Sequence, residues 1–346
     1  MADDSSHYPE KGKQMKPLLS ICIPSLNRPE FLLQAVNSIH AGKASLEKIE
    51  ICISNNFSDL DYSEVEEKFE SAASVCNVKY IRHNTRLSLD ENMHYVKKMA
   101  SGDFIYFLGD DDCFLMDQID ILVEFIGAKE PDLAIFNGHL VDANNCYLGR
   151  HFNLPSKEYR AHDDAFMDLR DKGMFGAVLV RRDLLQDDDF IKLYGTSHAY
   201  GCYWLSIMRE YERNNNAKIF IPDFPCVALR CTKKNYNHIY VYYRDIPYEL
   251  AVYKRFTEPR MLQLITKFER SQNKKISSIR FLCSLSDFGC DLNSIEIVNP
   301  LFYENNKLII KVSKFIASSM GYKLIKKLYQ KHVRAAELTA PIFRLP

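Results

Sequence analysis

The chain of 346 residues has little that points to a membrane span, to secretion or to nucleic acid. No apolar run reaches the roughly 20 residues that a transmembrane helix needs. Residues 1–16 are polar, so we expect a disordered start or a tag there and no signal peptide. The 45 basic and 45 acidic side chains balance, so overall charge gives no reason to expect a nucleic-acid partner.

The ten cysteines form no C-x-x-C pair and no Cys/His quartet at zinc spacing, which argues against the usual zinc sites. Cys22 and Cys52 fall inside apolar runs, where a free cysteine behaves as a small apolar side chain. Cysteines used in this way predict a reducing, cytoplasmic location. The chain also has no internal repeat and no low-complexity linker.

Short apolar runs alternate with amphipathic stretches from Leu18 onward. In the first part we expect strands at 18–24, 49–54, 78–82 and 104–108, and helices at 29–40, 63–73 and 89–100. This alternation predicts an α/β fold, a mostly parallel sheet with helices on both faces. Later we expect strands at 133–137, 174–180 and 218–221, and helices at 197–213 and within 248–289. We place the α/β domain at 17–240 and a mainly helical region at 241–346.

Polar clusters follow each of the first four predicted strands. In open parallel sheets, ligands bind beyond the carboxyl ends of the strands. The sequence places four clusters at that edge: 24–28, 54–56, 82–84 and 109–112. We therefore expect these four segments to surround a common ligand.

Gly109-Asp110-Asp111-Asp112 is the most informative of these clusters. Three consecutive carboxylates raise one another's pKa and call for a compensating cation. Mg²⁺ or Mn²⁺ prefers carboxylate oxygens and also takes oxygens from a diphosphate, and Gly109 lets the chain approach a ligand closely. An acidic helix cap at Asp112 or Asp117 is the alternative. It explains one carboxylate, whereas the metal site explains three.

Three motifs, in order, resemble those of the inverting family 2 glycosyltransferases of the GT-A fold. The segment P-S-L-N-R at 24–28 resembles their P-T-Y-N-R, and I-S-N-N-F-S-D at 53–59 resembles V-D-D-G-S-x-D. The segments S-G-D at 101–103 and Y-F-L-G-D-D-D at 106–112 are similar to S-G-E-Y-I-x-F-L-D-x-D-D. The G-D-D-D form resembles a subgroup typified by the abequosyltransferases of bacterial O-antigen assembly. The resemblance is dense over about a third of the chain.

The resemblance implies a role for each matching residue. Asp111 corresponds to the metal-binding Asp of D-x-D, Gly109 replaces the first Asp of that motif, and Asp112 would help the metal or the acceptor side. Asp110 would lie near the ribose or the sugar. Asn55 stands where many members have an Asp that bonds the base, so the base stays open. The other positions that would border the nucleotide-sugar are Pro24, Ser25, Asn27, Arg28, Asn84 and Asn92.

The reaction implied by the resemblance is displacement at the anomeric carbon. A bound Mn²⁺ or Mg²⁺ would stabilise the diphosphate leaving group, and a general base would deprotonate the acceptor hydroxyl. Candidate bases are His198, Asp188 and its neighbours Asp187 and Asp189. The aspartate run also fits a solvated loop, and His198, at the start of a predicted helix, also fits a packing role. The base and the stereochemical outcome therefore stay open.

The stretch 307–334 is basic, with eight Lys or Arg and no Asp or Glu. At helical spacing one face collects Leu308, Ile309, Val312, Phe315, Ile316 and Met320, with lysines opposite. A second basic amphipathic helix follows Gly321. Such helices lie on anionic membrane surfaces. We therefore expect 307–335 to contact an anionic membrane, or to pack on the domain with a solvated basic face.

Taken together, the residues predict an enzyme that moves a sugar from a nucleotide-diphosphate sugar to a glycan or lipid-linked saccharide. The resemblance places this in bacterial surface polysaccharide synthesis, O-antigen or capsule, and we expect a cytoplasmic protein, peripheral on the inner membrane face. A non-catalytic GT-A scaffold that binds nucleotide-sugar in an assembly complex is the alternative. A nucleotidyltransferase would need a glycine-rich phosphate loop, and 24–29 has no glycine.

Overall fold

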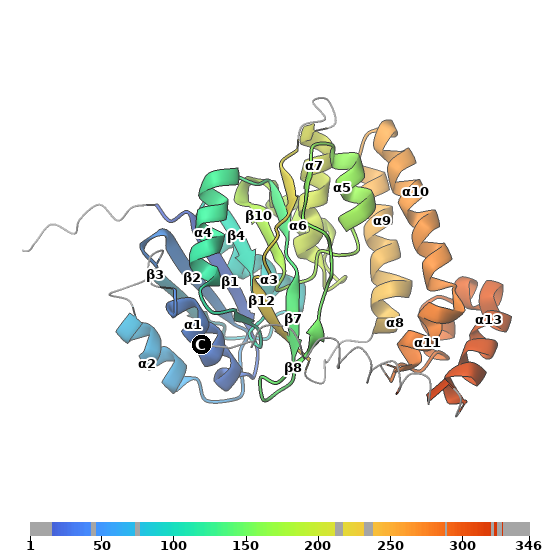
Figure 1. Ribbon diagram of the computed structural model, residues 1–346, viewed down its shortest axis with the longest axis horizontal. Helices are drawn as coiled ribbons and strands as arrows, with labels where there is room; N and C mark the ends of the chain where they lie inside the picture. The colour runs from blue at the N-terminus through green and yellow to red at the C-terminus, as the bar shows by residue number, and fades with distance from the viewer. Residues whose placement is uncertain are drawn as a thin grey trace, which may run out of the picture.

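The computed structural model describes residues 16–42, 46–72, 77–211, 217–231, 238–287 and 289–319, with 322, 323 and 327. Its centre is an eight-stranded sheet (Figure 1). Across the sheet the strands are β3 (Asn77–Arg82), β2 (Ile49–Asn55), β1 (Leu19–Ser25), β4 (Phe104–Phe107), β10 (Val178–Arg181), β6 (Leu133–Ile135), β11 (Ile219–Ile221) and β9 (Lys157–Tyr159). The expected disordered start at 1–16 lies almost wholly outside the described residues.

Most strands of this sheet run in one direction, which confirms the predicted fold class. β3, β2, β1 and β4 are parallel neighbours, and β6 and β11 run the same way. β10 and β9 run against their neighbours. The first four predicted strands are therefore adjacent, and their carboxyl ends meet at one edge, as the sequence indicated.

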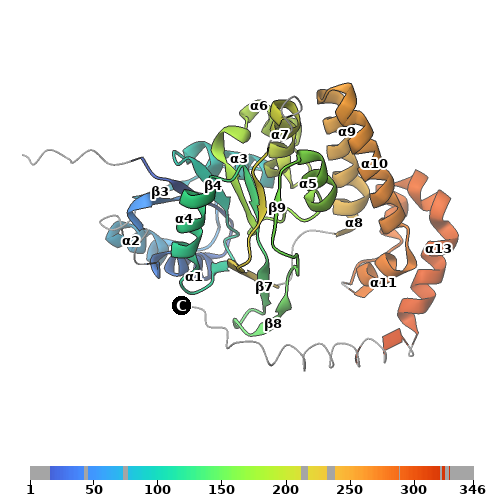
Figure 2. The same cartoon turned by 45° about the horizontal axis from the view of Figure 1, so that its top comes forward.

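The helices cover both faces of the sheet (Figures 1 and 2). α1 and α4 share an apolar core with alternate side chains of β1, including Leu19 and Ile21. The core on the other face includes Cys22 and is shared by α3, α5, α6 and α7, together with α9 (Ile246–Phe256) and α10 (Pro259–Ile276). The helices of the domain are α1 (Pro29–His40), α2 (Ser63–Ala72), α3 (Leu89–Met99), α4 (Gln118–Lys129), α5 (His162–Leu169), α6 (Asp187–Lys192) and α7 (Tyr203–Tyr211). Single 3₁₀ turns form η1 (Leu46–Lys48), η2 (Arg182–Leu184) and η3 (Ala199–Cys202).

A second, four-stranded sheet was not predicted. Its order is β5 (Cys113–Phe114), β12 (Val227–Arg230), β7 (Gly138–Val141) and β8 (Tyr147–Arg150). These strands are two to four residues long, too short to give a periodic pattern. β5 follows directly on Gly109-Asp110-Asp111-Asp112, which we call the aspartate turn. This small sheet therefore holds the aspartate turn from outside the main sheet.

Three expectations in the second half were wrong in part. The stretch 174–180 forms a strand only at its end, in β10, and 197–213 forms the turn η3 before α7 instead of one helix. The interpretation of 187–189 as a solvated loop was also wrong, because these residues open α6. Their carboxylates suit the first turn of a helix, where the backbone N–H groups are unpaired.

The C-terminal region is helical, as expected, and has two kinds of packing. α9 (Ile246–Phe256) and α10 (Pro259–Ile276) belong to the core shared with α7. The remaining elements build a separate core around Tyr243 and Ile310. These are α8 (His238–Tyr240), the π-helix η4 (Val241–Asp245), α11 (Ile279–Asp287), α12 (Ser294–Val298) and α13 (Pro300–Ser318).

The basic stretch enters this region through α13, which begins before residue 307 and ends at Ser318. Its side chains Tyr303, Ile310 and Ala317 are buried, so the helix packs on the protein. The second predicted basic helix falls mostly outside the described residues. In the described part of the chain, no helix is both long and apolar enough to cross a bilayer.

Glu50 holds the amino-terminal edge of the first strands together. Its fully buried carboxylate accepts hydrogen bonds from Ser20 at 2.5 Å and from Ser101 Oγ at 2.8 Å, and Lys79 lies 2.7 Å away. Burial would raise the pKa of Glu50, but these partners outweigh it and lower the pKa. The ionised form therefore stabilises the fold.

We expect Glu50→Gln to lower the free energy of unfolding by about 2 kcal/mol at neutral pH, because it leaves Lys79 and the hydroxyls underpaired. Since the folded pKa is lowered, the stabilisation is present above the ordinary value of 4.5 and is lost as the pH falls through the folded value. Urea unfolding at several pH values measures both effects. Exposed Glu47→Gln is the control, and equal losses in the two variants would contradict the role of Glu50.

Candidate functional site

The aspartate turn follows β4 at the carboxyl edge of the sheet. Asp110 is buried and accepts hydrogen bonds from the backbone N–H of Leu26 at 3.0 Å and from Arg28 Nη1 at 3.0 Å. The same Nη1 lies 3.0 Å from Asp111 Oδ2. One guanidinium thus balances two neighbouring carboxylates and ties the loop after β1 to the turn after β4.

Asp110 and Arg28 hold opposite charges in a largely desolvated place. Burial raises the pKa of Asp110 to about 6, against the opposing effect of Arg28. Arg28 is 29% exposed, and its remaining donors Nε and Nη2 make no hydrogen bond within the described residues. Free donors of a guanidinium suit a phosphate oxygen. Asp110, whose pKa is close to neutrality, is therefore paired with a guanidinium whose other donors can bind an anion.

Asp112 points into the protein. Its Oδ1 accepts the backbone N–H of Arg230 at 2.9 Å. A Cβ on Gly109 would lie 2.6 Å from Asp112 Oδ2, and one on Gly176, which has φ +90°, would lie 2.7 Å from the same oxygen. The carboxylate of Asp112 thus occupies a niche that only glycines allow, and this explains why glycine stands at the first position of the motif.

Arg230, at the end of β12, holds the aspartate turn in place by hydrogen bonds. The side chain is 98% buried and donates from Nε to the backbone oxygen of Asp111 at 2.8 Å. Its Nη2 donates to Gln34 Oε1 at 3.0 Å, and the guanidinium lies 4.6 Å from the ring centre of Phe31. The backbone of Asp111 is therefore fixed, and its carboxylate is directed by Arg28.

The loop of Pro24, Ser25, Asn27 and Arg28 is fixed by hydrogen bonds to the segment after β2. Tyr62 OH bonds Ser25 Oγ at 2.8 Å and accepts the backbone N–H of Arg28 at 3.0 Å. Asn27, at φ +55°, donates from its amide to Asp59 at 3.0 Å and accepts the Asp59 backbone N–H at 2.7 Å. Pro24 and Ser25 are buried in β1, whereas Leu26, Asn27 and Arg28 are half-buried.

Asn55 lies fully buried at the end of β2. Its amide donates to Tyr80 OH at 2.8 Å, and its oxygen accepts the backbone N–H of Ser58 at 3.1 Å. An Asp at this position would accept from Ser58 but could not donate to Tyr80. The substitution of Asn for the usual Asp therefore suits a tyrosine that itself donates to Glu66 at 2.8 Å.

Asn92 and Asn84 lie in different surroundings. Asn92 is buried in α3, where Ser54 Oγ donates to its oxygen at 2.6 Å and its amide donates to the Ser54 backbone oxygen at 3.2 Å. Asn84 is exposed in the loop after β3. The structure thus brings Asn92 together with the loop after β2 and leaves Asn84 at the rim.

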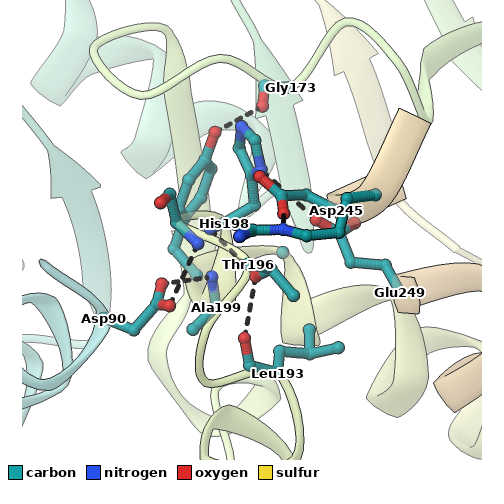
Figure 3. Close-up of polar contacts among 12 residues, drawn as sticks. Asp90, Gly173, Leu193, Thr196, His198, Ala199, Asp245 and Glu249 are labelled. Atoms are coloured by element: carbon teal, nitrogen blue, oxygen red, sulfur yellow. Dashed lines mark hydrogen bonds and ion pairs between the residues drawn. The ribbon is translucent and has the colours of Figure 1, made fainter. Parts of the chain in front are cut away.

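The loop that carries His198 is held to the start of α3 (Figure 3). Asp90, 98% buried, accepts the backbone N–H groups of Gly195 at 2.8 Å, Ser197 at 3.0 Å and Ala199 at 3.1 Å. Burial raises the pKa of Asp90, although these donors oppose it. Because α3 begins just beyond β3, His198 lies at the same edge of the sheet as the aspartate turn.

His198 meets an ion pair from two other elements. Its Nδ1 lies 3.4 Å from Oε1 of buried Glu249 in α9, and Glu249 pairs with Arg170, which follows α5. Burial and the nearby Arg170 lower the pKa of His198 to about 4. The side chain is 28% exposed, and Nε2 has no hydrogen bond within the described residues. A neutral imidazole with one nitrogen toward a carboxylate can accept a proton on the other.

The aspartates of α6 are arranged differently. Asp187 bonds Lys97 Nζ at 2.5 Å and His94 Nε2 at 3.0 Å. Partial burial opposes these partners, but they lower the pKa of Asp187 to about 2, and they occupy the carboxylate that a general base would use. Asp189 is buried against Arg209, and Asp188 is exposed. Asp188 thus differs from its two neighbours, Asp187 and Asp189, which are held in ion pairs.

The side chains at this edge of the sheet offer few ligands to the expected divalent cation. In the described part of the chain, no three His, Cys, Asp or Glu side chains are grouped to hold a metal. Mg²⁺ typically takes one or two carboxylates and completes its shell with substrate phosphates and water. Asp111, at the strand end beside the open donors of Arg28, fits this second arrangement.

Four residues of the site were missed by sequence reasoning: Tyr62, Asp90, Arg230 and Glu249. Each acts through a partner far away in the chain, up to 196 residues for Arg230 and Gln34. Asp90 lies inside an ordinary capping box formed by Ser88 and Glu91, so nothing local marks it. No signal in the sequence alone distinguishes these residues.

Two curated relatives are similar to this chain. The abequosyltransferase RfbV of Salmonella typhimurium is 31% identical over 112 residues, which are 32% of this chain and 33% of that protein. The GalNAc(5)-diNAcBac-PP-undecaprenol beta-1,3-glucosyltransferase of Campylobacter jejuni is 28% identical over 204 residues, 56% of this chain and 60% of that one. The chain thus spans about a third of the length of the Salmonella relative and three fifths of the length of the Campylobacter relative.

Solved structures share the fold at low identity. S. aureus TarS 1-349 in complex with UDP-GlcNAc has a TM-score of 0.53 at 15% identity, over 88% of this chain and 82% of that one. The mannosyltransferase PcManGT from Pyrobaculum calidifontis, in complex with GDP-Man and Mn²⁺, has a TM-score of 0.52 at 11% identity, over 95% and 89%. Residues 20–189 match glycosyl transferase family 2. This segment is therefore similar to glycosyl transferase family 2, and the chain has a GT-A fold.

Proposed function

We propose that the protein transfers a sugar from a nucleotide-diphosphate sugar to a saccharide acceptor in the synthesis of a bacterial surface polysaccharide. The main support is the pair of ion pairs that Arg28 makes with Asp110 and Asp111 at the carboxyl edge of the sheet. It places open guanidinium donors beside a carboxylate where a diphosphate would lie. The named activities of the two relatives support the same reaction class.

The donor would lie across the loops after β1 and β2. The exposed parts of Asn27 and Arg28 border this space, with Asn84 at its rim. Arg28 would bind the diphosphate, and Asp110 would keep the loop closed through Leu26. Asp111 would hold Mn²⁺ or Mg²⁺ together with the donor. When bound, the cation would offset the charge that develops on the leaving diphosphate.

The acceptor would be activated by His198. Glu249 faces Nδ1, so the proton of the neutral ring would sit there and leave Nε2 to take the proton of the acceptor hydroxyl. Arg170 holds Glu249 in place. Asp188 is the rival base, and Asp112 is less suited because its carboxylate is enclosed by the glycine niche.

The relatives and the basic C-terminal stretch support a proposal for the acceptor class. The Campylobacter relative's name includes a saccharide on undecaprenol diphosphate, a lipid-linked substrate. We infer that this protein also takes a glycan or lipid-linked saccharide and works as a peripheral protein on the inner face of the cytoplasmic membrane. The stretch 307–335 would supply the contact with anionic lipid.

Thermal shift with UDP-, GDP-, CDP- and dTDP-sugars and Mn²⁺ tests the donor, because a ligand that binds only the folded state raises its stability. We expect one base to stand out and its sugar to be transferred. Binding without transfer or hydrolysis would instead support a non-catalytic scaffold.

Asp111→Asn is expected to slow transfer roughly hundredfold or more, since loss of the metal removes several kcal/mol of charge stabilisation. Paramagnetic resonance of free Mn²⁺ should show tight binding only when nucleotide is present, and none in the variant. Asp61→Asn, an exposed change near the same edge, is the control. Full activity in excess EDTA would contradict the metal's role.

Donor affinity is expected to fall as the pH drops through about 6, because protonation of Asp110 weakens its bonds to Leu26 and Arg28. Calorimetric titration of the nucleotide on both sides of pH 6 measures this. Asp110→Asn should bind about tenfold more weakly at neutral pH and lose the pH dependence. A wild-type affinity that is constant across pH 6 would refute the assignment.

His198→Gln is expected to lower kcat about a hundredfold or more with little change in donor KM, as for the loss of a general base. The low pKa of His198 places its acidic limb in kcat/KM near pH 4, below the ordinary 6.5. Glu249→Gln should lower kcat less and move that limb. If Asp188→Asn removes activity while His198→Gln keeps it, the base is Asp188.

A further inference from the structure

α13 and α12 expose a row of large apolar side chains. Leu301, Leu308 and Phe315 recur every seven residues along one side of α13, and Ile297 of α12 precedes them. All four are between 74% and 80% exposed. Val312, 38% exposed, fills the gap between Leu308 and Phe315. We call these five residues the apolar stripe.

The apolar stripe is not the side through which α13 packs on the protein. α13 already packs through a different side, where Tyr303, Ile310, Ser313 and Ala317 are buried against α11 and α12. A helix that packs on one side normally carries polar groups on the other. Large apolar side chains in a row on the outer side instead mark an interaction surface.

Positive charge flanks the apolar stripe on one side. Lys307, Lys311 and Lys314 lie between the buried side of α13 and the stripe, as helical spacing requires. Lys307 reaches Glu304 at 3.2 Å, and Lys314 bonds Asn293, so their stems are directed along the surface. The following sequence adds Lys323, Lys326, Lys327, Lys331 and Arg334 without any Asp or Glu.

We propose that the apolar stripe inserts into the headgroup region of an anionic lipid bilayer, with the flanking lysines on the lipid phosphates. This combination of apolar and basic faces is that of a helix that lies in a membrane interface. A second copy of the chain fits less well, because a two-fold contact through the stripe would bring Lys307, Lys311 and Lys314 toward the same lysines of the partner.

The position of α13 suits this arrangement. In both views α13 lies at the end of the molecule opposite α2 (Figures 1 and 2). The surface extends the predicted membrane segment backward, to Leu301 and to Ile297 in α12. Membrane binding and sugar transfer can be measured separately, so failure of one leaves the other standing.

Co-sedimentation with phosphatidylcholine vesicles, with and without phosphatidylglycerol, tests the proposal on the full chain. We expect binding to the anionic vesicles, weakened by salt. Leu308→Ser with Phe315→Ser should bind at least about tenfold more weakly, since two apolar side chains lose their burial in lipid. Ile121→Ser, an exposed change on α4, should bind as the wild type does.

Fluorescence gives a second readout that does not depend on affinity. The sequence has one tryptophan, Trp204, which is fully buried, so its emission should stay constant. Phe315→Trp is expected to shift to shorter wavelength when anionic vesicles are added. Unchanged emission, or equal vesicle binding by the double serine variant, would overturn the proposal. A stable dimer in ultracentrifugation that the serine variant dissolves would overturn it too, in favour of a second copy.

Discussion

One guanidinium between two adjacent carboxylates organises the candidate site. Arg28 lies 3.0 Å from both Asp110 and Asp111, and Leu26 closes the same loop on Asp110. A run of three aspartates after a buried strand was expected to depend on an external cation. The chain supplies part of that compensation itself, so the loop after β1 and the turn after β4 form one unit before any ligand binds.

The first half of the fold was predictable because its signals are local. Alternation of apolar runs and amphipathic stretches marks each strand and helix, and the polar clusters mark the carboxyl edge. The roles of individual polar residues were less accessible. Asn55 and Asn92 matched family positions, yet their amides are bound to Tyr80 and Ser54 inside the protein. Whether an amide or carboxylate faces the ligand depends on side chains far away in the sequence, and a local sequence pattern does not identify them.

The second half shows how a distant side chain overrides a local pattern. The stretch 197–213 has helical periodicity, but Asp90, 107 residues before Ser197, takes three backbone N–H groups at its start. Ser197 is thereby held at φ +60°, a conformation outside a helix. The result is a loop that presents His198 and is hydrogen-bonded to a residue that looks like an ordinary first-turn aspartate.

The helical region divides into parts with different relations to the chemistry. α9 shares a core with β4 and α7, and it supplies Glu249 to His198. α11, α12 and α13 share a separate core that contains none of the candidate site residues. This core meets the core of the site through α10, which contributes Ile276 to the one and Ile265 to the other. The outer side of α13 belongs to neither core, so substitutions there test the proposed lipid contact while the aspartate turn and His198 keep their geometry.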